Sequence, residues 1–205
     1  MSAEFPLAIL AKAPLVGQVK TRLIPALGAE RATHLHERLL RQTLATAVAA
    51  TSARRITLWT ALDHAHPLFL ELARRYDIEL RAQPAGDLGQ RMHHALAAML
   101  EPGLVIGSDC AVLTPALLRQ CHSALAESDA ACLPAEDGGY ALIGARRPES
   151  GLFAGINWGS ERVMAQTRHR VEALGWRLAC PATVWDVDRP EDVARWLGVD
   201  AAAGA

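Results

Sequence analysis

Lysine is almost absent from this sequence. Of 21 Lys and Arg residues only Lys12 and Lys20 are lysines, and both lie within residues 7–23. A lysine ammonium is a compact point charge that suits a phosphate oxygen, whereas arginine presents a flat fork of donors. The placement of both lysines in one stretch therefore favours an anion site there over the alternative, an ordinary surface turn with two solvated charges.

An excess of charge and long apolar runs are also missing. The formal net charge is −1 with no charge block, which gives no electrostatic footprint for nucleic acid or an anionic membrane. The opening residues lack the basic and apolar regions of a signal peptide, and no apolar run is long enough for a membrane span. The four cysteines have no C-x-x-C spacing, which disfavours structural zinc and predicts a cytoplasmic protein with buried, reduced thiols.

Several catalytic motifs are absent. There is no G-x-S-x-G nucleophile elbow and no Cys/His pairing, so covalent hydrolase chemistry is not supported. The full G-x-G-x-x-G fingerprint is missing after the first predicted strand, which argues against a dinucleotide oxidoreductase. The eight histidines lie mostly on predicted helices, without H-E-x-x-H, and we interpret them as solvated positions.

What the sequence does contain is an alternation of strand and helix patterns. This alternation predicts an α/β protein with a doubly wound, mainly parallel sheet, folded as one domain over residues 1–198. A disordered tail is expected at 199–205, and the apolar face of the helix at 29–50 would allow a homodimer. Strands are expected at 6–11, 55–61, 79–83, 103–107, 130–134, 140–145 and 176–179, and helices at 29–50, 66–75, 87–100, 114–126, 160–174 and 190–197.

The stretch with the two lysines begins in the first predicted strand and ends before the first predicted helix. Lys20 and Arg22 fall in a loop that also holds Pro14 and Gly17. A strand–loop–helix unit with basic residues in its loop is how α/β proteins hold the phosphates of a nucleotide. We therefore predict a phosphate site in this loop.

Acidic residues follow three predicted strands, at the sheet edge where such folds bind ligands. Asp109 ends the central strand, and a carboxylate there suits Mg²⁺ or Mn²⁺ bound together with substrate phosphates. Its alternative role is a helix cap, but Thr114 and Pro115 already begin the next helix.

Two further acidic groups and one helix start have competing interpretations. Asp137 begins an Asp-Gly-Gly turn, which is typical of a hairpin and also allows a ligand close to the backbone. For Asp188 a helix start is favoured over a D-x-D metal motif, and Asp186 is left open. Asp87 predicts a capping box with Gln90, ahead of a helix in which Gly89 permits close approach and Arg91 faces either phosphate or solvent.

Six short motifs together carry a resemblance to a known family. The chain contains, in order, AKAPLVGQVKTRL (11–23), DLGQRM (87–92), GSDC (107–110), PAEDGGYALIG (134–144), WGS (158–160) and DVDRPED (186–192). This set resembles the glycosyltransferase-like family DUF2064, a domain of unknown function of the radical-SAM-associated transferase type. The family looks like the nucleotide-diphospho-sugar transferase superfamily, with a Rossmann-like GT-A fold, and its first loop is similar to that of phospholactate guanylyltransferases.

The resemblance also implies roles for residues. Two departures are Ala111, where the family usually has proline, and Gly159 within W-G-S, where it has W-S-T. The metal, Mg²⁺ or Mn²⁺, would lie on Asp109 and Asp137, which with Lys20 would be catalytic. The nucleotide phosphates would contact Lys12, Gly17, Lys20, Thr21, Arg22, Asp87, Gly89 and Arg91, and the sugar or acceptor would contact Gly138, Gly139, Tyr140, Trp158 and Ser160.

Three reactions fit these expectations. The first is metal-dependent glycosyl transfer from a nucleotide-diphosphate sugar to a small-molecule acceptor, which the family's placement favours. The second is nucleotidyl transfer, in which a phosphorylated acceptor attacks a nucleoside triphosphate. The third is a nucleotide-binding module without catalysis, which the presence of both Lys20 and Asp109 disfavours.

Overall fold

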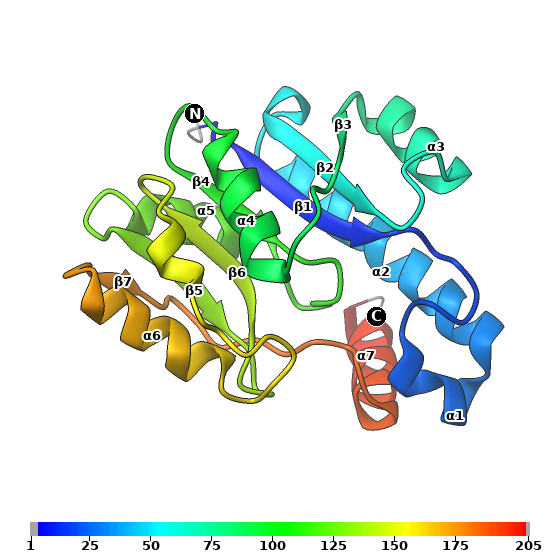
Figure 1. Ribbon diagram of the computed structural model, residues 1–205. Helices are drawn as coiled ribbons and strands as arrows, with labels where there is room; N and C mark the ends of the chain where they lie inside the picture. Colours follow the sequence, from blue (N-terminus) through cyan, green and yellow to red (C-terminus); the bar gives the residue numbers. More distant parts are fainter. Residues whose placement is uncertain (1–3, 204–205) are drawn as a thin grey trace.

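The computed structural model describes residues 4–203, and the side chains of residues 4–198. In this part of the chain seven strands form one sheet in the order β3-β2-β1-β4-β6-β5-β7 (Figure 1). The strands are β1 (Leu7–Lys12), β2 (Ile56–Ala61), β3 (Glu79–Ala82), β4 (Gly103–Ile106), β5 (Ala130–Pro134), β6 (Tyr140–Ala145) and β7 (Leu178–Ala179).

The sheet is mainly parallel, as predicted. Only β6 runs against its two neighbours, β4 and β5, because the short turn at 135–139 forms a hairpin between β5 and β6. The chain extends the sheet from β1 to β2 and β3 and then returns to place β4 on the other side of β1. The carboxyl ends of β1, β4, β5 and β7 consequently lie at the same edge of the sheet.

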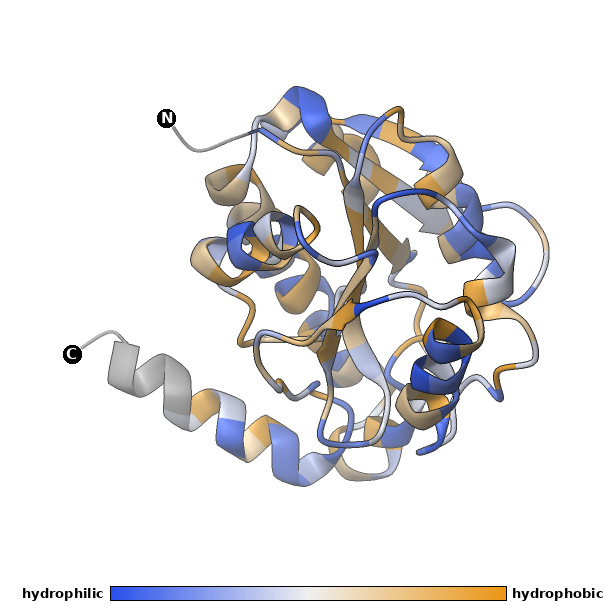
Figure 2. Cartoon of the chain, turned by 90° about the vertical axis from the view of Figure 1, so that its left-hand side faces the viewer, coloured by the Kyte–Doolittle hydropathy of each residue, from blue (hydrophilic) through white to orange (hydrophobic). Residues whose placement is uncertain are grey.

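Helices cover both faces, as Figure 2 shows with the sheet nearly edge-on. Apolar side chains of α2, α3 and α5 pack on one face, and those of α4, η3 and α6 pack on the other. Such double coverage explains why β4 is buried at every position. The helices are α1 (Ile24–Leu27), α2 (Ala29–Ala50), α3 (Pro67–Tyr76), α4 (Leu88–Ala97), α5 (Pro115–Ala124), α6 (Val163–Ala173) and α7 (Pro190–Ala203), with short 3-10 turns η1 (Thr21–Leu23), η2 (Ala53–Arg55) and η3 (Ser150–Phe153).

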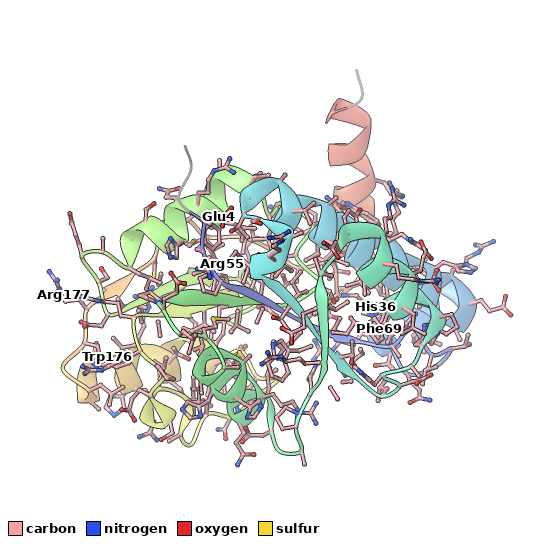
Figure 3. The ribbon with its side chains drawn as sticks, turned by 90° about the horizontal axis from the view of Figure 1, so that it is seen from above. Glu4, His36, Arg55, Phe69, Trp176 and Arg177 are labelled. Atoms are coloured by element: carbon pink, nitrogen blue, oxygen red, sulfur yellow. The ribbon has the colours of Figure 1, made fainter. Side chains whose placement is uncertain are left out.

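A third apolar cluster joins the two ends of the chain beside the carboxyl edge of the sheet. Leu23 and Leu35, from η1 and α2, pack with Trp185 and Val187, and with Trp196 of α7. The rest of α7 projects from the body of the molecule (Figure 3). This cluster holds the 185–188 segment next to the loop that follows β1.

Most predicted elements are present at or near their predicted bounds. The capping box of Asp87 and the Thr114 cap are both formed. The expected start of one helix, at residue 160, was wrong. Ser160 does not cap α6, which begins at Val163, because the Ser160 hydroxyl donates to the Asn157 carbonyl instead.

The chain's last helix also differs from its expected extent. α7 continues past residue 197 to Ala203, so the expected tail at 199–205 overlaps its last turn, and residues 204–205 lie outside the described residues. Among residues 4–203, no helix is both long and apolar enough to cross a membrane.

Candidate active site

A large cavity opens at the carboxyl edge of the sheet, where β1 and β4 lie side by side and the chain direction switches. Its volume is about 1200 Å³. Open parallel sheets bind ligands at such switch points. The predicted residues that line the cavity are Lys12, Lys20, Thr21, Arg22, Arg91, Asp109, Asp137, Gly139, Tyr140, Trp158 and Ser160.

Lys20 lines this cavity, but its ammonium is held by the protein itself. The side chain is only 2% exposed, and Nζ lies 2.8 Å from Asp109 Oδ1. Nζ also donates to the Val187 carbonyl oxygen at 2.6 Å. The backbone of Lys20 has a φ of +48°, which is strained for a side-chain-bearing residue. These contacts fix Lys20 on the floor of the cavity.

Asp109 is the partner of both Lys20 and a histidine. Nearly half of its side chain faces the cavity (47% exposed), while Oδ1 is enclosed by protein. Burial alone would raise the pKa of Asp109, but the Lys20 ammonium and the His36 ring outweigh it and hold that pKa well below its usual range. Asp109 is therefore ionised throughout the neutral range.

His36, labelled in Figure 3, was not recognised from the sequence. It is buried on α2, where Nε2–H donates to the Lys12 carbonyl oxygen at 2.9 Å and Nδ1 lies 3.8 Å from Asp109 Oδ1. It thus links the end of β1 to the end of β4. The only available signal was that a polar residue stands among the apolar residues of a helix face, which by itself indicates burial and not a partner.

Asp186 completes a group of carboxylates. The 184–187 segment continues beside β5, because Val184 exchanges backbone bonds with Pro134 and Glu136. Asp186 Oδ1 is buried and without a hydrogen-bond partner. Burial, and then the charges of Asp109 and Asp137, raise the pKa of Asp186 to about 7. The surroundings of Asp186 therefore disfavour its ionised form, through burial first and through neighbouring negative charge second.

The role of Asp188 differs from the helix start that was predicted for it. Its carboxylate accepts from Arg22 of the first loop, at 2.5 Å, and caps no helix amide. Asp192, in the first turn of α7, fixes the helix start from the other side, because its Oδ2 accepts from the backbone N–H groups of Asp188 and Arg189, which precede the helix. The ion pair, like the pairing of Lys20 with the Val187 carbonyl, joins the first loop to the 185–188 segment.

The Asp137 turn and the α6 loop form the opposite wall. Asp137 is exposed, and its Oδ1 accepts from the Gly139 amide at 2.9 Å. Gly138 does not line the cavity. Its φ is +87° and a Cβ there would lie 2.0 Å from the Glu161 carbonyl oxygen, so it allows the turn to pack against the α6 loop. The Gly138 carbonyl accepts from the Met164 amide, which fixes the start of α6.

Trp158 lines the cavity on this side. Its ring lies edge-on to Tyr140, with 6.3 Å between centroids, and its Nε1–H is buried with no partner. Gly89 packs so closely against this ring that a Cβ at residue 89 would lie 2.6 Å from Trp158 Cζ2. The close approach predicted at Gly89 is thus to an indole ring, and the residue does not line the cavity.

The remaining predicted residues lie near the rim. Asp87 serves the capping box of α4, and Gly17 occupies the first loop with a φ of +82°. Neither lines the cavity. Arg91 does so, and its Nη1 lies 3.4 Å from the Gln83 side-chain oxygen.

A divalent metal fits this site only with help from a ligand. Among the described residues no three His, Cys, Asp or Glu side chains lie together as a metal site. Mg²⁺, however, is commonly held by one or two carboxylates plus substrate phosphates. Asp109 and the unpartnered oxygen of Asp186 provide such a pair.

The DUF2064 family model, described as an uncharacterised protein family conserved in bacteria, matches residues 39–160. The chain belongs to this family. No curated protein matches it.

Solved structures extend the comparison. A candidate nucleotide-diphospho-sugar transferase from Desulfovibrio desulfuricans is 28% identical over 91% of this chain and 83% of its own, with a TM-score of 0.80. A CMP:2-keto-3-deoxy-manno-octonic acid synthetase complexed with CTP is 9% identical, covering 98% of this chain and 100% of its own, with a TM-score of 0.64. A Mycobacterium tuberculosis protein complexed with manganese is 16% identical over 96% and 99%, with a TM-score of 0.57. The comparisons confirm the family, the nucleotide-diphospho-sugar transferase fold and the transferase class predicted from the sequence.

Proposed function

We propose that this protein is a metal-dependent glycosyltransferase that uses a nucleotide-diphosphate sugar as donor. The observation that carries the proposal is the crowding of Asp109, Asp137 and Asp186 in a cavity that is also lined by three cations, Lys12, Lys20 and Arg22. A cavity carboxylate whose pKa is raised by burial and by neighbouring carboxylates, as that of Asp186 is, is a signature of a site that works with a cation.

In this proposal Asp109 and Asp186 hold Mg²⁺ or Mn²⁺, and Asp137 lies toward the acceptor. The metal would neutralise charge on the diphosphate as it leaves the sugar. Lys12 and Arg22 line the same side of the cavity and bind the remaining phosphate oxygens. Catalysis then depends mainly on positioning and on electrostatic stabilisation of the leaving group.

The acceptor side supports a hydroxyl acceptor. Asp137 and Glu161 line it, and neither has an ion-pair partner in the described part of the chain. Carboxylates accept hydrogen bonds from sugar-like hydroxyls but repel a phosphate group. Trp158 and Tyr140 supply apolar faces beside them, which suits the C–H surface of a sugar ring.

Nucleotidyl transfer is the second candidate, and one observation favours it. Arg162 and Arg189, which do not belong to the first loop, also line the cavity, and they would attract the phosphate of an acceptor. The solved relative with bound CTP has the same fold. In that reaction an acceptor phosphate would attack the α-phosphorus of a nucleoside triphosphate and release pyrophosphate.

Thermal-shift binding to a panel of nucleoside triphosphates and nucleotide-diphosphate sugars, with and without Mn²⁺, separates these reactions. We expect Mn²⁺-dependent stabilisation by one nucleotide-diphosphate sugar, followed by release of a nucleoside diphosphate when an acceptor is added. Stabilisation by a triphosphate alone, with pyrophosphate release, would favour nucleotidyl transfer. No response to either class would refute both reactions and the nucleotide-binding module as well, and would leave only the fold.

A further inference from the structure

The contacts of Lys20 set it apart from the other cations of the cavity. Its ammonium is enclosed between Asp109 Oδ1 at 2.8 Å and the Val187 carbonyl oxygen at 2.6 Å. The Val187 amide in turn donates to the Asp109 backbone oxygen at 2.9 Å. Lys20, Asp109 and Val187 thus form a closed ring of contacts on the floor of the cavity.

In this arrangement the Lys20 ammonium occupies the position beside Asp109 at which the proposed function requires a divalent metal ion. Asp109 Oδ1 is the oxygen enclosed by the protein, and Lys20 is the cation against it. A second cation bound to the same carboxylate would lie within a few ångströms of the ammonium. Two like charges at that separation repel strongly in a partly buried site.

We propose that Lys20 is a tethered counter-cation, which occupies the cation position at Asp109 and leaves it when a divalent metal binds. This inference rests on the proposed function, in which Asp109 holds the metal. In the free protein, Lys20 keeps Asp109 ionised and neutralises its charge. Without Lys20, the carboxylates around Asp186 would lack this compensating cation. The released ammonium then faces the cavity, where a ligand phosphate would receive it.

Two consequences follow for binding. The metal alone must displace Lys20 and therefore binds weakly, whereas a phosphate that accepts the ammonium makes the displacement easier. Metal and phosphate ligand accordingly strengthen the binding of one another, because coupling of this kind is reciprocal.

The chain provides a matched control. Lys12 is the only other lysine. It lines the same cavity but is exposed and has no carboxylate at ion-pair distance among the described residues. Replacing either lysine by methionine removes one positive charge from the cavity, but only Lys20→Met removes the competitor at Asp109.

The first test measures Mn²⁺ affinity without nucleotide, from the electron paramagnetic resonance signal of free Mn²⁺. We expect Lys20→Met to bind Mn²⁺ at least about tenfold more tightly than the wild type, and Lys12→Met to differ from it by less than about threefold. Asp109→Asn in the Lys20→Met background should abolish the gain. Equal affinities for the Lys20→Met and Lys12→Met proteins would overturn the inference.

The second test follows release of Lys20 in the wild type. Acetylation of amines, read by mass spectrometry, distinguishes Lys20 from Lys12 because there are no other lysines. We expect Lys20 to be protected without metal and modified at least about fivefold faster with saturating Mg²⁺, while Lys12 is unchanged. Metal binding without release of Lys20 would overturn this inference alone. If neither wild type nor Lys20→Met binds metal, the metal role in the proposed function is wrong, and the inference with it.

Discussion

Asp186 should destabilise the metal-free protein at neutral and alkaline pH, and Asp186→Asn should remove that penalty. The folded protein keeps the Asp186 proton up to about pH 7, whereas the usual pKa of the group is 3.8. Folding therefore takes up a proton between these two values, and the stability of the wild type falls as the pH rises through this window. Above pH 7 the carboxylate is ionised in both states and the penalty is constant.

The size of the penalty follows from the two pKa values. Their difference of about 3, at about 1.4 kcal/mol for each tenfold change in acidity, gives an upper limit of about 4 kcal/mol. The side chain is not fully buried, so water screens part of this energy. We expect Asp186→Asn to be about 2–4 kcal/mol more stable than the wild type at pH 8, with a much smaller advantage at pH 4.

Urea unfolding at pH 4, 5, 6, 7 and 8 in the presence of a chelator measures this directly. The matched variant is Asp188→Asn, which removes a nearby carboxylate that is already paired with Arg22. Its stability should not rise with pH relative to the wild type. An advantage of Asp186→Asn that stays the same at every pH, or that is absent at pH 8, would refute the reasoning.

Three further predictions concern the site and its packing. Asp109→Asn should lower kcat by about 10²–10³-fold in the transferase assay with its fold preserved by circular dichroism, and an unchanged rate would remove Asp109 from the metal role. Gly138→Ala should lower the free energy of unfolding, measured in urea, by about 2–4 kcal/mol, because its Cβ would lie 2.0 Å from the Glu161 carbonyl oxygen and φ is +87°. The control Gly159→Ala, at φ +80° in open space, should lower it by only about 1 kcal/mol. Equal losses for the two variants would contradict the clash at Gly138. Gly89→Ala should destabilise the protein by about 1–2 kcal/mol because the new methyl group displaces Trp158, although alanine favours a helix. The control Gly198→Ala, in open space on α7, should stabilise the protein by about 0.5–1 kcal/mol. A gain in stability for Gly89→Ala would show that the Trp158 ring moves freely.

Local patterns were sufficient for the elements and for the general location of the site. The apolar period of 29–50, the Asp87 capping box and the Thr114-Pro115 start are read from neighbours within a few residues, because those neighbours make the contacts. Alternation of strands and helices then implied a mainly parallel sheet, and with it a common edge for the residues that follow β1, β4 and β5. This is why Lys20, Asp109 and Asp137 were expected to converge.

The tertiary structure alone decided what those residues do to one another. Lys20 is 89 positions from Asp109 and 167 from Val187, and no periodicity links such distant positions. The same is true of His36 with Asp109, of Gly89 beneath Trp158, and of the carboxylates that raise the pKa of Asp186. Charge interactions and close packing depend on separation in space, and the sequence by itself determines only which groups are available to meet.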